Sequence, residues 1–131
     1  MIAVDLTRVI VDEEKREQLI VLKERDGLRI LSIVIGIAEA TAIRMKLSRT
    51  FPARPLTHDL VAAVILSLGG RVERVVIDKI LEGTFHAKLY VEDKDGVVKI
   101  IDSRPSDSIV LSLSFKAPLF VEDDVFKSLS K

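Results

Sequence analysis

The chain has 131 residues, of which 48% are hydrophobic and 31% charged, and its 20 basic residues balance its 20 acidic residues. This length and composition predict one globular domain over residues 1–131 and exclude a disordered chain. The absence of cysteine excludes disulfides, thiol catalysis and zinc–thiolate sites. Because the chain has neither a run of about 18 apolar residues nor a signal-peptide pattern, we expect a cytoplasmic protein without a membrane span.

The first part of the chain predicts strands followed by a helix. Residues 2–10 alternate in hydropathy, which is typical of a strand with one buried side. Asp26-Gly27 separates two β-rich runs, and this dipeptide predicts a hairpin because both central residues of such a turn take positive φ. Residues 37–47 then follow a helical pattern.

A second helix is predicted after a loop that contains two prolines. Thr57 is expected to be its N-cap, with Asp59 in the first turn, where the helix dipole favours negative charge. The helix should end near Leu68, before two glycines. Its apolar residues cover more than one face, which predicts a well-buried helix.

The second half of the chain repeats this order of elements. Ser106 is expected to cap a third helix that runs to about Lys116, and a final short helix should begin at Asp123 or Asp124. Strands are predicted at 71–83, 84–93, 97–102 and 118–122.

Two segments of the sequence resemble each other, "RPLTHDLVAAVILSL" at 54–68 and "RPSDSIVLSL" at 104–113. The turns at Asp26-Gly27 and Asp95-Gly96 also precede similar strand–helix units. We interpret these matches as repeated hairpin–helix units. Because hairpins dominate over βαβ units, the expected class is α+β, with a mixed, mostly antiparallel sheet and three main helices.

His58 belongs to the first of two candidate sites. It lies beside Asp59 and downstream of Arg54. Near a helix start the dipole favours neutral imidazole, which is the form that a general base needs. The alternative is a capping arrangement with an ordinary surface histidine.

The motif "DSRPSD" at 102–107 forms the second candidate site. Arg104 and the free N–H groups of a helix that starts at Ser106 are suited to phosphate. Alternatively, Asp102 and Asp107 hold a divalent cation, with Glu39 as a further ligand. The structural alternative is that Asp107 and Glu39 complement helix dipoles, while Asp102 pairs with Arg104 to fix the turn.

Local positive charge is concentrated in "RMKLSRTFPAR" at 44–54, which contains Arg44, Lys46, Arg49 and Arg54 and no acidic residue. This segment is the candidate nucleic-acid contact, and the alternative is a solvated helix end and loop. Most of the five phenylalanines and the one tyrosine look like core residues. Few aromatic side chains would then be available to stack on bases.

Four segments together resemble the bifunctional nuclease domain family: "IGIAEATAI", "RPLTHDL", "VERVVIDKILEGTFHAKLYVE" and "IDSRPSDSIVLSLSFKAPLFV". The resemblance spans about residues 1–125. It implies a small α+β domain, often self-associating, whose members are reported to act on DNA and RNA. The resemblance implies no agreed set of catalytic residues. It carries over only the motif residues, which are Glu39, His58, Asp59, Asp102, Arg104, Ser106 and Asp107.

The sequence therefore supports two hypotheses. The first is a nuclease that hydrolyses DNA and RNA with Mg²⁺ or Mn²⁺, and it requires its carboxylates to converge in one cleft. Its catalytic candidates are His58, Asp59, Asp102 and Asp107. Its metal ligands would be Glu39, Asp102 and Asp107, and its substrate contacts Arg44, Lys46, Arg54, Arg104 and Ser106. The second is a non-catalytic homo-oligomeric interaction module or nucleic-acid-binding module. Zero net charge and scarce exposed aromatics favour a non-catalytic module over a general nucleic-acid enzyme, and the many apolar strand faces are consistent with a homo-oligomer.

Overall fold

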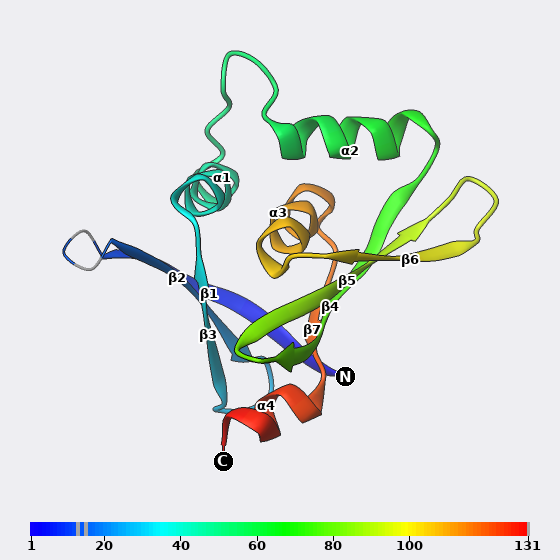
Figure 1. The fold of residues 1–131 in the computed structure, drawn as a ribbon. Coiled ribbons are helices and arrows are strands. Elements are labelled where there is room, and N and C mark those ends of the chain that lie inside the picture. Colours follow the sequence, from blue (N-terminus) through cyan, green and yellow to red (C-terminus); the bar gives the residue numbers. More distant parts are fainter. Residues whose placement is uncertain (13, 15, 131) are drawn as a thin grey trace.

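A seven-stranded sheet and four helices make up the residues that the structure, a computed structural model, describes: 1–12, 14 and 16–130 (Figure 1). The α+β class is therefore confirmed. The elements are β1 (Ile2–Asp12), β2 (Glu17–Glu24), β3 (Ile30–Ile35), α1 (Ile37–Ser48), α2 (Thr57–Ser67), β4 (Arg71–Leu81), β5 (Thr84–Glu92), β6 (Val98–Ser103), α3 (Pro105–Phe115), β7 (Leu119–Val121) and α4 (Asp123–Leu129).

The sheet has the strand order β3-β2-β1-β7-β4-β5-β6. Its neighbouring strands are antiparallel except for β4 and β7, which are parallel, so the predicted mixed and mostly antiparallel sheet is correct. Each half contributes three consecutive strands and then a helix, and β7 joins the halves in the middle. This order agrees with repeated units, although a duplication itself stays a prediction.

Helices α1 and α3 lie side by side against one face of the sheet, and α4 lies at the other side (Figure 1). Alternating strand residues and the inner sides of α1 and α3 form the core between them. Its most deeply buried large side chains include Ile20, Leu22, Leu31, Ile43, Val75, Ile77 and Ile109. No helix in the described part of the chain is long and apolar enough to span a membrane.

Helix α2 contradicts the prediction of a well-buried helix, because none of its residues is buried. It lies outside α3, across the top of the molecule in Figure 1. Only one side faces inward, through His58, Ala62 and Ile65, which are half-buried. The side chains of Leu60 and Leu68 are 59% and 70% exposed.

The starts of α2 and α3 also differ from the prediction. Leu56 and Arg104, not Thr57 and Ser106, occupy the N-cap positions. Pro105 takes the first position of α3, where a missing N–H costs nothing and the fixed φ suits a helix. The Asp59 carboxylate accepts a hydrogen bond from the Leu56 backbone N–H at 2.9 Å, so the acid of the motif stabilises the start of α2.

Candidate functional site

A groove of about 640 Å³ lies between α1, α2 and α3. Four of the sequence-predicted residues line it, and they come from three separate segments of the chain: Glu39 of α1, His58 of α2, and Arg104 and Asp107 at the start of α3. Apolar side chains such as Leu89 of β5 and Val61 of α2 form other parts of its wall. The fold therefore brings parts of both candidate sites into one cavity.

Arg104 is held between two carboxylates at this groove. Its Nε and Nη2 donate to the two carboxylate oxygens of Asp107 at 2.8 and 2.9 Å, and its Nη1 donates to Glu39 Oε1 at 3.0 Å. The hydrogen bonds to Asp107, and then the one to Glu39, raise the pKa of a guanidinium that is charged at any physiological pH. The side chain of Arg104 remains 65% exposed and accessible to a ligand.

The turn from β3 into α1 explains how Glu39 reaches Arg104. Gly36 is the N-cap of α1, and a Cβ atom there would lie 2.3 Å from Glu39 Oε2. Glycine therefore lets the Glu39 carboxylate fold back over the turn. Since Arg104 precedes α3, the Glu39–Arg104 ion pair connects the first turn of α1 to the start of α3.

A hydrogen bond between the half-buried Ser103 and the buried Ser108 fixes α3 relative to the sheet. The hydroxyl of Ser103, at the end of β6, bonds to the hydroxyl of Ser108, which is fully buried in α3. Ser103 also lines the groove. The wall that presents Arg104 is therefore anchored to the sheet edge on both sides of the residue.

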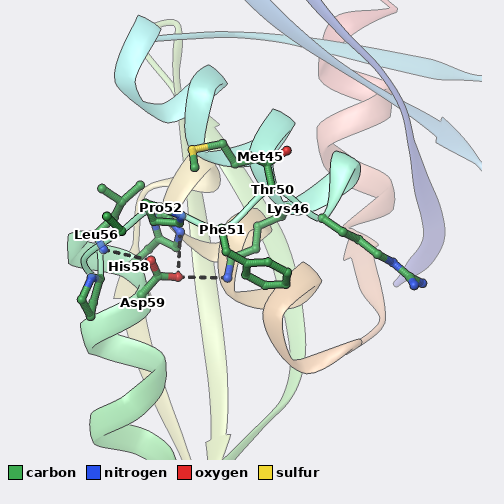
Figure 2. Close-up of a pocket in the computed structure, with 11 residues that line it drawn as sticks. Met45, Lys46, Thr50, Phe51, Pro52, Leu56, His58 and Asp59 are labelled. Carbon is green, nitrogen blue, oxygen red and sulfur yellow. Dashed lines mark hydrogen bonds and ion pairs between the residues drawn. The ribbon is translucent and has the colours of Figure 1, made fainter.

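His58 connects the groove to a second, smaller cavity of about 380 Å³ (Figure 2). This loop pocket lies between the end of α1, the loop 49–56 and the start of α2. In it the Asp59 carboxylate contacts His58 Nε2 at 3.2 Å and Lys46 Nζ at 3.0 Å. Asp59 thus positions the imidazole and the ammonium group together.

The electrostatics of this cluster favour a neutral imidazole. Burial lowers the pKa of His58, the neighbouring Asp59 carboxylate opposes that shift, and the Lys46 ammonium adds to it. The pKa of Asp59 is lowered chiefly by the hydrogen bond from the Leu56 N–H and further by Lys46 and His58. At neutral pH the cluster therefore consists of a carboxylate, an ammonium and an uncharged imidazole that is able to accept a proton.

Asp102 does not join the groove. Side chains alternate between the two faces of a strand, so Asp102 points away from the face that its neighbour Ser103 presents to the groove. Its carboxylate accepts a hydrogen bond from Lys88 Nζ at 2.8 Å, and this bond lowers the pKa of Asp102. Lys88 also lies 3.7 Å from Asp78 across the neighbouring strands. The expected pairing of Asp102 with Arg104 is not formed.

Three other predicted substrate contacts lie elsewhere. Ser106 is buried and lines a separate cavity between the end of β3 and the β4–β5 turn. Arg44 lines a shallow depression beside β1 on the outer side of α1. Arg54 lies exposed in the loop before α2, between two residues of the loop pocket.

The carboxylates are not arranged as the metal hypothesis requires. Within the described ranges, no group of three or more His, Cys, Asp or Glu side chains is placed to hold one ion. The Arg104 guanidinium bridges Glu39 and Asp107, and a cation between them would have to displace it. These residues therefore do not fit a carboxylate-bound Mg²⁺ or Mn²⁺.

Phe51 is a residue that the sequence interpretation missed. Its side chain is 83% exposed in the loop 49–56, and it lines the loop pocket. The other five aromatic side chains, all within the described residues, are buried or half-buried. The sequence signal was its context, a phenylalanine between a basic helix end and two prolines in a segment that reads as a loop.

Comparisons with known proteins agree with the resemblance. The family model described as "Bifunctional nuclease domain" matches residues 20–131, a range that starts later and ends later than the expected 1–125. Two similar curated proteins come from Mycobacterium tuberculosis, "Uncharacterized protein MT1877" from strain CDC 1551 / Oshkosh and "Uncharacterized protein Rv1829" from strain ATCC 25618 / H37Rv. Each is 38% identical over 115 residues, which cover 88% of this chain and 68% of the relative.

Proposed function

Because the chain belongs to the bifunctional nuclease domain family, we propose that its groove binds and hydrolyses a phosphodiester of DNA or RNA. The observation that carries the proposal is that His58 and Arg104 line one cavity, although they lie 46 positions apart in sequence. A neutral imidazole and an accessible guanidinium are the two groups that such a hydrolysis uses without a resident metal ion.

Arg104 is proposed to bind the phosphate. A guanidinium has five N–H donors, and the bonds to Asp107 and Glu39 use one each on Nε, Nη1 and Nη2. Two donors therefore remain for non-bridging phosphate oxygens. Asp107 and Glu39 act as positioning residues that hold the guanidinium in place, so less entropy is lost when the phosphate binds.

His58 is proposed to be the general base. It takes a proton from a water molecule while the water oxygen attacks phosphorus. The bond from phosphorus to the leaving oxygen breaks, and that oxygen takes a proton from the imidazolium or from solvent. Arg104 stabilises the extra negative charge that develops on the phosphoryl oxygens in the transition state. Asp59 orients the imidazole through its 3.2 Å contact with Nε2.

The experiment is a cleavage assay on labelled single-stranded RNA and duplex DNA, with Mg²⁺, with Mn²⁺ and with EDTA. We expect cleavage to fall at least about 100-fold in His58→Gln and in Arg104→Gln, the scale on which single catalytic groups act. Arg25→Gln is the matched control, because Arg25 is also ion-paired, to Asp5 at 2.8 Å, and does not line the groove. Cleavage that survives both groove substitutions contradicts the proposal.

The EDTA arm tests the expectation of Mg²⁺ or Mn²⁺. Since Arg104 bridges the groove carboxylates, we expect activity to persist when EDTA is present. Loss of activity in EDTA, restored by either ion, would show that a metal takes part in the reaction. It would also move the search for ligands outside the Glu39–Arg104–Asp107 cluster.

A second candidate function is a non-catalytic homo-oligomeric module, and the exposure of α2 favours it. Leu60 and Val64 of this helix and Leu68, its C-cap, are spaced four residues apart and so lie along one side. Their side chains are 59%, 49% and 70% exposed. The titratable residues of α2, His58 and Asp59, belong to its first turn and face the two cavities. The remaining exposed side carries no charge, so a second copy of the same uncharged surface is its natural partner.

A further inference from the structure

We infer that the loop 49–56 is a binding platform for single-stranded nucleic acid, on which one base stacks against Phe51. The inference rests on the proposed function, because the strand would then lead into the groove. It adds a substrate preference, for unpaired strands rather than duplex. It also adds a contact residue, Phe51, that neither the motifs nor the family match assigns.

The exposure of Phe51 is the first observation. A phenylalanine side chain that is 83% exposed leaves most of its ring in water, at a free-energy cost that burial would remove. Pro52 directly follows it and disfavours a helical backbone at position 51. Pro52 and Pro55 also stiffen the loop, so less conformational entropy is lost when a ligand orders it.

The charge around Phe51 is the second observation. Between Glu39 and Asp59 the chain has no acidic residue and four basic ones. Lys46 is paired with Asp59, whereas the side chains of Arg49 and Arg54 have no ion pair among the described residues. Both are exposed, one at the end of α1 and the other in the loop. Although the net charge of the chain is zero, two arginines that have no ion pair among the described residues lie close in sequence to Phe51, its one exposed aromatic side chain.

The position of the loop pocket is the third observation. Phe51 and Arg49 both line it. His58, drawn beside Asp59 in Figure 2, lines both this pocket and the groove that holds Arg104. A strand whose base stacks on Phe51 can therefore continue past His58 towards Arg104. The backbone N–H of Thr50 bonds to the Met45 carbonyl at 2.9 Å, which fixes where the loop leaves α1.

These features favour an unpaired strand. Base stacking on an aromatic ring is tolerant of sequence, since every base has a π-face, but a base inside a duplex is already stacked on both sides. A duplex would have to lose a pair and a stack before it could use Phe51. A lone ring with two arginines suits one or two unpaired nucleotides.

Phe51→Trp supplies a direct test, because the chain has no tryptophan of its own. We expect its fluorescence to be quenched when a 12-nucleotide oligo(dT) or oligo(U) binds, and to change little with a 12-base-pair duplex at the same nucleotide concentration. Leu28→Trp is the matched control, because Leu28 is 89% exposed and lies in the hairpin turn between β2 and β3. Equal quenching at both positions, or none at position 51, overturns the inference.

Affinity measured by fluorescence anisotropy of labelled oligo(dT) and oligo(U) tests the energetic role of the ring. Phe51→Leu keeps an exposed apolar side chain but removes the aromatic face, and we expect at least about fivefold weaker binding of single strands. Arg49→Gln and Arg54→Gln should each reduce the slope of log K against log salt by about 0.7. Unchanged affinity in Phe51→Leu overturns the inference.

These binding measurements separate the inference from the proposed chemistry. Binding that depends on Phe51 without any cleavage supports the platform and contradicts the hydrolytic function. Cleavage that depends on His58 and Arg104 but is equal in Phe51→Leu supports the hydrolytic function and contradicts the platform. Preference for duplex over single strands in the anisotropy assay also contradicts the platform.

Discussion

Helices α2 and α3 have similar sequences and opposite environments. Each has an Arg-Pro pair at its start, directly before the N-cap in α2 and as the N-cap and first residue in α3. Both have 11 residues and are rich in apolar side chains. Seven residues of α3 are buried between the sheet, α1 and α2, whereas none of α2 is buried. The two helices are therefore similarly apolar but differ in burial, because α3 is part of the core and α2 lies at the surface.

The difference shows that the sequence of a helix with apolar residues on every side does not predict what the helix packs against. Hydropathy measures a preference to leave water, and the core of the same chain is one way to satisfy it. A second copy or a ligand is another. In α2 the inward side lines the groove through His58 and Val61, and the outward side is left exposed.

The largest contrast is expected in stability. Ile109→Ala in α3 removes a side chain that is 1% exposed, and we expect it to lower the free energy of unfolding by about 2–5 kcal/mol. Leu60→Ala in α2 should change it by less than about 0.5 kcal/mol at low protein concentration. Urea denaturation at micromolar concentration measures both. A similar loss in the two variants would mean that α2 is part of the core.

The next effect concerns assembly. If the exposed side of α2 binds a second copy, Leu60→Lys with Val64→Lys should reduce the mass in solution to that of one chain, 14.6 kDa. Sedimentation velocity across a concentration series measures this. Leu28→Lys is the control, because Leu28 is also exposed but lies outside α2. A wild-type protein that stays a single chain at high concentration would contradict self-association through α2.

The smallest effect concerns pH and the first turn of α2. Burial lowers the folded-state pKa of His58 below 6.5, so the unfolded chain takes up a proton first as the pH falls. The contribution of neutral His58 to the free energy of unfolding is thus complete above about pH 6.5 and is lost progressively below that pH. We expect the wild type to lose stability relative to His58→Gln between pH 7 and 5 in urea denaturation. A relative gain would mean that His58 is charged and paired with Asp59.

Much of the fold follows from local sequence signals. The alternating strands, the helix at 37–47 and a hairpin between β2 and β3 were predicted correctly, because hydropathy period and turn residues act over a few positions. The turn itself differs from the prediction: β2 ends at Glu24 and β3 begins at Ile30, and neither Asp26 nor Gly27 has a positive φ, so the connection is longer than a two-residue turn. The cap residues were not predicted correctly either, because proline at the first position of α3 outweighs the capping preference of Ser106. The burial of α2 depends on contacts between distant segments, which periodicity does not contain.

The candidate site was predictable in its residue types and less so in its grouping. The sequence interpretation selected Glu39, His58, Arg104 and Asp107, and the fold places them around one groove. Asp102 was grouped with them because it is close in sequence, but strand alternation turns it to Lys88. Nothing in the sequence shows that Glu39 reaches Arg104, since 65 positions separate them.

The position of β7 has a consequence for the order of folding. This strand of three residues pairs with β1 on one side and β4 on the other, and α4 follows it in the chain. The two three-stranded halves therefore cannot join into one sheet until residues 119–121 have left the ribosome. Contacts between Val4 and Leu119 span most of the chain, which is typical of slow-folding topologies. During synthesis, the inner edges of β1 and β4 stay open to wrong pairings until β7 emerges and pairs with both.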